Sequence, residues 1–272
     1  MNNKALVIGA IVAVALAAGA WWFIINGNVA YFNNQNNNQN QDSQHGTLYM
    51  SITDDGINMG NVSAVTMTVD KVYIHSQAQG WVDVSYSSPQ TFSLLELKAS
   101  EKSKLMAKAV VFADTYDQVW FHVANVAVTE SGQVKTAAMP SNDVKMNVAV
   151  KVMGNTDSTA DVDIMADQSL HKDANGQFIF APVVKFESRS NASVNIDANN
   201  LLTISGGSID SSVNSGMDAN GEVKANFKLD SEQKLEIKNN IINKVNIDSQ
   251  SEPSPGPCAT ETDGSVAVGV GC

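Results

Sequence analysis

Residues 144–152, VKMNVAVKV, decide the class of fold. Every second residue is apolar, in the series Val144, Met146, Val148, Val150 and Val152. Side chains at alternate positions of a β-strand point to the same face, so this pattern predicts a strand with one buried face and one polar face.

Similar short alternating segments recur along the chain and are separated by turn sequences such as TDDG, QAQG, ESG and DANG. The predicted strands include 48–53, 65–75, 81–84, 92–97, 118–128, 160–165 and 178–186. Within residues 65–75 the apolar phase shifts, which predicts a β-bulge at Asp70 and Lys71. Residues 99–111 (ASEKSKLMAKAVV) are the segment with helical character. Many short strands with few helices predict an all-β fold, an antiparallel β-sandwich of immunoglobulin-like or transthyretin-like type.

An apolar run precedes the predicted sandwich. Residues Ala5 to Ile25 contain no charged side chain and as a helix would extend about 30 Å, the thickness of the hydrocarbon core of a bilayer. Lys4 is the nearest cation, so the positive-inside rule places the N-terminus in the cytoplasm and the rest outside. The sequence thus predicts one N-terminal transmembrane helix, and a cell-membrane protein with an extracellular C-terminal domain.

Two other interpretations of this run remain open. Ala18-Gly19-Ala20 fits the small-residue cleavage site of a signal peptide, which would make the protein secreted. Lys4-Ala5 before a long apolar helix resembles the processing site of archaeal pilin-type signals, which would make the helix the core of a filament.

Composition divides the chain into five parts: an anchor (1–26), an Asn/Gln-rich linker (27–45), a sandwich (46–190), further strands or a small appended β unit (191–248), and a tail (249–272). The linker contains NNQNNNQNQDSQH, a run suited to a flexible spacer between a membrane helix and a folded head. The tail holds the two cysteines of the chain, Cys258 and Cys272. Outside the cell we expect them to form a disulfide.

Charge excludes one class of partner. The formal net charge is −11, and Arg189 is the single arginine. A surface that neutralises phosphates needs clustered basic residues, so nucleic acid is not an expected partner.

The sequence lacks the motifs of known catalytic machinery. Its four histidines lie far apart in sequence, and no nucleophile elbow, H-E-x-x-H helix or phosphate loop is present. We therefore predict a protein that is not an enzyme. Trp81 and Trp120 each lie inside an alternating strand, which favours a place in the core or on a sheet face over a role as a ligand platform.

Acidic turns are the best metal candidates. Asp54 and Asp55 follow the first predicted strand, and calcium prefers carboxylate and carbonyl oxygens from extracellular loops. They are a candidate Ca²⁺ site, and no other cofactor is expected. The two DANG segments (173–176 and 218–221) fit hairpin turns better than calcium loops.

Two Asn-x-Ser sequons, at Asn61 and Asn191, are candidate glycosylation sites, since both are predicted to be extracellular and near strand ends.

The order of motifs between residues 46 and 188 resembles domain-of-unknown-function family 4382, which occurs on secreted and surface proteins of bacteria and archaea. The matching motifs, in order, are GTLYMSITD (46–54), VDKVYIH (69–75), Gly80-Trp81, TFSLLEL (91–97), TYDQV (115–119), Ser169-Leu170-His171 and PVVKF (182–186). The resemblance implies a surface β-sandwich and transfers no catalytic residue. Two positions depart from the family pattern: Asp114 stands where Gly is common, and Trp120 where Arg is frequent.

Together these observations predict a membrane-tethered extracellular β-sandwich with a structural or binding role in adhesion or the envelope. Its expected partners are the membrane, through the N-terminal helix, and a cell-surface protein, a glycan or further copies of the chain. One alternative is a filament subunit assembled through its N-terminal helix or a donated strand. A second is a calcium-dependent extracellular glycan-binding module.

Overall fold

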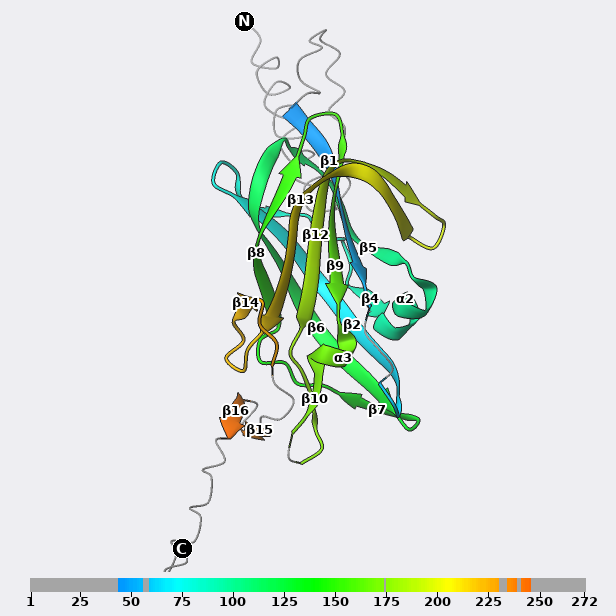
Figure 1. Ribbon diagram of the computed structural model, residues 1–272, viewed down its shortest axis with the longest axis vertical. Helices are drawn as coiled ribbons and strands as arrows, with labels where there is room; N and C mark the ends of the chain where they lie inside the picture. Colours follow the sequence, from blue (N-terminus) through cyan, green and yellow to red (C-terminus); the bar gives the residue numbers. More distant parts are fainter. Residues whose placement is uncertain (1–43, 56–58, 174, 230–233, 239–240, 246–272) are drawn as a thin grey trace, which may run out of the picture.

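A computed structural model describes residues 44–55, 59–173, 175–229, 234–238 and 241–245 (Figure 1). Ala5 to Ile25, most of the linker and the tail with Cys258 and Cys272 lie outside these residues. None of the helices formed by the described residues has both the length and the apolar character needed to cross a bilayer.

Two sheets form the body of the molecule (Figure 1). Sheet A consists of β12 (Val183–Ile196), β9 (Asp157–Ile164), β1 (His45–Thr53), β5 (Ser103–Phe112), β13 (Leu201–Met217) and β14 (Val223–Ala225). Sheet B consists of β3 (Gly80–Asp83), β2 (Val62–Ser76), β6 (Asp114–Glu130) and β7 (Gln133–Thr136), with β4 (Gln90–Ser93) paired to β2 and β8 (Asp143–Val152) paired to β6. The all-β prediction is confirmed.

Smaller elements complete the described chain. They are two short helices, α2 (Leu94–Ser100) and α3 (Ala166–Ser169), and two small hairpins, β10 (Leu170–Lys172) with β11 (Phe178–Phe180) and β15 (Lys234–Lys238) with β16 (Ile241–Val245).

The sequence predicted antiparallel pairing throughout, but one pair of strands is parallel. β1 pairs with β9 in parallel, from Thr47 opposite Asp157 to Thr53 opposite Asp163. β1 is antiparallel to β5 on its other side, so one strand joins both kinds of ladder. Alternation within a strand fixes its faces but not the direction of its neighbours, which is why the periodicity did not reveal this pair.

One apolar core lies between the sheets. Met50 and Ile52 of β1 meet Ile74 of β2 and Phe121 of β6 in one cluster, and each of these side chains is fully buried. Burying an aliphatic or aromatic side chain of this size stabilises the fold by about 1.5–3 kcal/mol. In β8 the residues of the opening pattern behave as predicted, with Val144, Met146, Val148, Val150 and Val152 all buried.

The bulge predicted in β2 is present. The pairing of β2 with β6 shifts between Val69, opposite Val123, and Lys71, opposite His122, so Asp70 is the extra residue. Asp70 and Lys71 are both outside the core, while Val69 and Val72 on either side are buried. The bulge therefore adds a carboxylate to the outer face of sheet B.

The predicted strand at 92–97 and the predicted helix at 99–111 are wrong over most of their length. β4 ends at Ser93, and α2 follows with Leu94 and Leu97 buried and Glu101 closing it in a left-handed conformation. Leu, Glu and Lys are good helix formers, and the three-residue spacing of the two leucines puts them on one face. Residues 103–112 form β5 because pairing with β1 outweighs their local helical propensity.

The predicted strand at 178–186 is divided. Pro182 lies between β11 and β12, and proline cannot donate a hydrogen bond to a strand ladder. β12 then runs from Val183 to Ile196, past residue 190, and pairs with β13 along a long hairpin.

The end of this hairpin bends over the outer face of sheet A (Figure 1). There Leu202 pairs with Ser103 and packs with Tyr49 and Leu105 in a second apolar cluster. The bend coincides with Asn191 and with the pair Gly206-Gly207, all of which have positive φ. A Cβ on Gly207 would lie 2.7 Å from the Ser190 carbonyl oxygen, so glycine is required there.

Candidate functional site

An aromatic cleft lies on the outer face of sheet B. Its floor is formed by Tyr73 of β2, Trp81 of β3 and Trp120 of β6, and its volume is about 730 Å³. One side is formed by Ser141, Asp143, Lys145 and Asn147, from β8 and the residue pair before it, and the other by residues 221–224 at the β13–β14 turn. A cavity of this size with apolar and polar lining is typical of a ligand site.

Strand register brings the floor together. Tyr73 is directly opposite Trp120, and Trp120 is in turn opposite Lys145, so the three side chains form one row across β2, β6 and β8. In the next row, His75 is opposite Trp81 on one side and Gln118 on the other. Residues directly opposite on one face of a sheet are close enough to contact each other.

The aromatic rings contact one another. The Tyr73 and Trp120 rings stack, with centroids 4.6 Å apart and planes 21° from parallel. The Trp81 ring meets Trp120 edge-on, with centroids 6.2 Å apart and planes at 77°. Trp81 remains 42% exposed, which is high for the largest apolar side chain. The rings thus offer two differently inclined flat surfaces.

Charged neighbours hold these rings in place. Burial, and then the nearby Asp83 carboxylate, raises the pKa of Tyr73, so its phenol stays protonated and donates a hydrogen bond to Asp83. The Lys145 ammonium lies 4.8 Å from the centre of the Trp81 ring, in cation–π geometry. His75 also packs against Trp81, with ring centroids 4.9 Å apart, and its Nδ1 lies 2.7 Å from Asp117 Oδ1.

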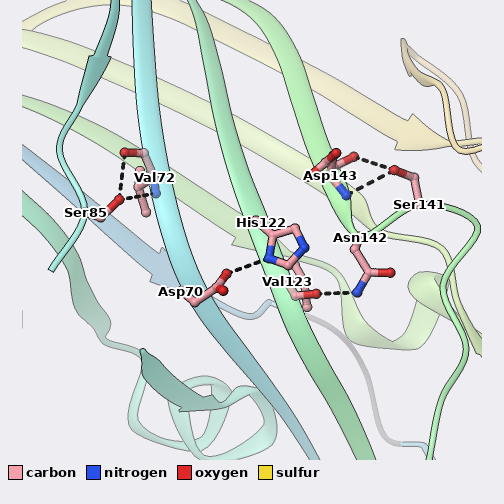
Figure 2. A network of polar contacts seen from close by, with 8 residues as sticks. All are labelled: Asp70, Val72, Ser85, His122, Val123, Ser141, Asn142 and Asp143. Carbon is pink, nitrogen blue, oxygen red and sulfur yellow. Dashed lines mark hydrogen bonds and ion pairs between the residues drawn. The ribbon is translucent and has the colours of Figure 1, made fainter. Parts of the chain in front are cut away.

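A polar network borders the cleft along β6 and β8 (Figure 2). His122 Nδ1 lies 2.6 Å from Asp70 Oδ1, the carboxylate that the bulge turns outward. The Asn142 side-chain amide donates to the Val123 carbonyl oxygen at 2.6 Å, and Ser141 Oγ accepts from the Asp143 backbone N–H at 3.0 Å. The bonds made by Ser141 and Asn142 hold the chain in place where β8 begins. Ser141, just before β8, and Asp143, its first residue, both line the cleft.

The opposite wall of the cleft is the second DANG turn. Asp218 Oδ1 accepts hydrogen bonds from the backbone N–H groups of Asn220 and Glu222, and its Oδ2 lies 2.6 Å from Lys224 Nζ. Gly221 has a φ of +83°, and a Cβ there would lie 2.5 Å from that of Ser141. Glycine therefore lets this turn pack against the loop before β8.

Both DANG segments are turns in the structure, as predicted. In the first, Asp173 Oδ1 accepts from the N–H groups of Asn175 and Gln177, the same pattern as in the second.

The predicted calcium residues lie at the other sheet. Asp54 is buried after the end of β1, and its Oδ1 accepts a hydrogen bond from the Ala166 N–H at the start of α3. Asp55 is exposed, and its backbone N–H donates to Asp163 Oδ1 at 2.9 Å. Within the described residues no group of three or more His, Cys, Asp or Glu side chains is arranged to hold a metal ion. Calcium binding at Asp54 and Asp55 stays a prediction.

Two further carboxylates, those of Asp161 and Asp163 on β9, lie near Asp54 and Asp55. Burial raises the pKa of Asp163 to about 6, helped by the charges of Asp55, Asp161 and Asp54. Burial also raises the pKa of Asp161, although Ser51 Oγ donates to its Oδ1 at 2.6 Å.

The remaining predicted sites fall in different places. Asn61 is exposed in the turn before β2, and Asn191 is exposed at the bend of β12 with a φ of +53°. Cys258, Cys272 and the segment from Ala5 to Ile25 lie outside the described residues, so their predicted disulfide and transmembrane roles remain predictions.

The aromatic cleft was missed by the sequence analysis, although one of its signals was visible. Val119, Phe121 and Val123 alternate inward, which places both Trp120 and His122 on the outer face. The alternation in the sequence is therefore enough to identify Trp120 as an outward aromatic. Trp120 is also one of the two positions that depart from the resembled family pattern.

Comparison with protein families gave one match. A model described as Domain of unknown function (DUF4382) matches residues 45–182, about half of the chain, and agrees with the resemblance drawn from the ordered motifs. No curated protein and no solved structure matched the chain. The matched residues contain the cleft floor and β8, whereas the wall at residues 221–224 lies beyond them.

Proposed function

The chain belongs to the DUF4382 family, a domain of unknown function, and we propose that it is a non-enzymatic binding protein of the cell surface that captures an extracellular partner in the aromatic cleft. In this proposal residues Ala5 to Ile25 anchor the chain in the membrane, the Asn/Gln-rich linker is a spacer, and the head is a β-sandwich of immunoglobulin-like or transthyretin-like type. The tail is closed by a disulfide between Cys258 and Cys272.

The observation that carries the proposal is the aromatic cluster on the outer face of sheet B, in which Trp81 is exposed and Tyr73 and Trp120 are half-buried. Beside these rings, along the edge of the cleft, β8 presents the exposed polar residues Asp143, Lys145 and Asn147. Exposed clusters of large aromatic side chains are uncommon on surfaces that contact only water, and they mark binding sites.

The geometry supports binding better than catalysis. The cleft is lined by two lysines and two carboxylates, Asp143 and Glu222, which lie on opposite walls of the cleft. Lys224 is held by ion pairs to Asp218 Oδ2 at 2.6 Å and Glu222 Oε2 at 3.1 Å. Among the residues that line the cleft, no acid and base converge on one point with a nucleophile between them, as acid–base catalysis requires.

A direct test measures binding of the full-length chain, carried in bilayer nanodiscs, to a sensor surface. The sensor surface bears immobilised cell-surface material, sheared from the cells that produce this protein. We expect the wild-type chain to bind and the double variant Trp81→Ala/Trp120→Ala to lose about five- to 150-fold in affinity, since each aromatic contact contributes roughly 0.5–1.5 kcal/mol.

The matched control is Phe112→Ala. Phe112 is also an exposed aromatic, at 45%, but it lies on β5 of sheet A. The Phe112→Ala variant should bind with the same affinity as wild type, and empty nanodiscs should not bind. Failure of the wild-type chain to bind, or full binding by the double variant, would refute the proposal.

The filament alternative depends on the N-terminal helix or on a strand donated from residues 21–32, both of which lie outside the described residues. Electron microscopy of sheared surface appendages tests it directly.

A further inference from the structure

The chemistry of the cleft lining narrows the class of ligand. Its ionised side chains are Asp143, Lys145, Glu222 and Lys224, two of each sign, in a chain whose net charge is −11. One of the two lysines, Lys224, is already paired with carboxylates. A ligand with a large charge of either sign gains little from such a balanced lining.

The cleft also offers hydrogen-bond donors and acceptors in equal measure around its aromatic floor. Asn147 carries both kinds in its amide, while Asp143 accepts and Lys145 donates. These groups come from one strand, β8, so they follow one edge of the floor.

The aromatic floor calls for a ligand with a flat apolar face. The Tyr73 ring covers one face of Trp120, and the remaining surfaces of Trp120 and Trp81 are inclined at 77° to each other. The faces of aromatic rings carry partial negative charge and attract the weakly positive hydrogens of C–H groups. A pyranose ring presents such C–H groups on a face and hydroxyl groups around its rim.

A cationic ligand fits less well. Aromatic clusters bind quaternary ammonium groups, but here the Lys145 ammonium already lies 4.8 Å from the centre of the Trp81 ring. The positive charge of Lys145 would repel a cationic ligand that approached the Trp81 ring.

We infer that the cleft binds a neutral glycan, with one sugar ring against Trp120, a second against Trp81, and hydroxyl groups bonded to Asp143, Lys145 and Asn147. This inference rests on the proposed binding function and names its ligand class. The site is independent of calcium, because Asp54, Asp55 and Asp163 belong to the sheet A side and do not line the cleft.

The experiment uses the same nanodisc-borne chain on an array of neutral, acidic and amino-sugar oligosaccharides, followed by titration calorimetry with the best neutral oligosaccharide. We expect neutral oligosaccharides to bind, Trp120→Ala to weaken the affinity about tenfold, and Trp120→Phe to retain most of it. Phe112→Ala and excess chelator should leave the affinity unchanged. Melting temperatures of the variants identify any that fail to fold.

Treatment of the cell-surface material separates this inference from the proposed function. Periodate, which cleaves vicinal diols of sugars, should abolish binding of the wild-type chain, whereas exhaustive proteolysis should not. If the Trp81→Ala/Trp120→Ala variant loses binding but proteolysis rather than periodate removes the partner, the cleft binds a protein and the glycan inference alone fails. A preference for acidic or cationic sugars on the array would also overturn it.

Discussion

Tyr73 on β2 and Trp120 on β6 are directly opposite each other, and their rings stack with centroids 4.6 Å apart on the outer face of sheet B. A cross-strand aromatic pair stabilises a sheet and at the same time leaves aromatic surface exposed to a ligand. The pair therefore links the stability of the sheet to the shape of the cleft.

The stacking of Tyr73 and Trp120 can be measured as a coupling energy. In a double-mutant cycle with Tyr73→Ala and Trp120→Ala, we expect the free energies of unfolding to be non-additive by about 0.5–1 kcal/mol, because removing either ring removes the contact. Chemical denaturation gives the four values. The pair Tyr73 and Phe112, which lie on different sheets, should be additive, and additivity within the stacked pair would contradict the contact.

Gly46, the first residue of the GTLYMSITD motif, is expected to be intolerant of any side chain. A Cβ at this position would lie 2.3 Å from the Met153 carbonyl oxygen and 2.7 Å from a Val152 methyl carbon. Gly46→Ala should lower the free energy of unfolding by about 1–3 kcal/mol, the usual cost of overpacking. The neighbouring Thr47→Ala, which creates no such overlap, should cost less; equal effects would show that close approach is not the reason for this glycine.

Alternation was the most informative feature of the sequence. It predicted β2, β6 and β8, and even the bulge at Asp70, because a strand with one buried face determines its side-chain directions locally. The helix predicted at residues 99–111 was wrong because Ala, Lys, Leu and Met favour helix locally. Pairing with β1, some fifty residues away, makes residues 103–112 a strand instead.

Predicting the cleft from the sequence would require information that no local pattern carries. Trp120 could be placed on the outer face, but its neighbour Lys145 follows from the register of β6 with β8. The wall at Gly221 and Lys224 depends on β13 pairing with β12 and returning through the DANG turn. Such long-range placement is a property of the whole fold.

Asp163 makes the stability of the protein depend on pH. Because burial raises its pKa to about 6 in the folded state, the folded chain holds a proton that the unfolded chain releases at lower pH. Its contribution to stability therefore decreases as pH rises from about 4 to about 6, and stays low above that. We expect Asp163→Asn, which keeps an oxygen for the Asp55 N–H, to be more stable than wild type at pH 7.

Denaturation of wild type and Asp163→Asn between pH 4 and pH 8 provides the check. The advantage of the variant should shrink as pH falls through 6. An advantage that does not change over this range would show that Asp163 is ionised in the folded protein at all these pH values.

Asp54 is expected to act as a structural carboxylate. Its Oδ1 accepts the Ala166 N–H at 3.0 Å, so Asp54→Ala leaves that buried donor unsatisfied and should cost about 1–3 kcal/mol of unfolding free energy. Asp54→Asn retains an acceptor and should cost less. We expect the order of the three proteins to be the same with millimolar calcium and with chelator, as judged by thermal melting. A calcium-dependent rise in the melting temperature that Asp54→Ala abolishes would instead support the predicted calcium site.

The state of the N-terminus decides how the cleft is displayed. Residues Ala5 to Ile25 are long enough to span a bilayer, and the apolar run continues past Ala20 as WWFII, so we expect an uncleaved chain that needs detergent for extraction. Intact-mass spectrometry of the protein from its native membrane should show Met1, or Asn2 if the initiator is removed. A mature chain beginning at Leu6 would favour the filament, because pilin-type processing leaves the apolar helix for assembly. A chain beginning at Trp21 would favour secretion, and the Asn/Gln-rich segment would then connect the head to a strand available for donation instead of separating the head from a membrane.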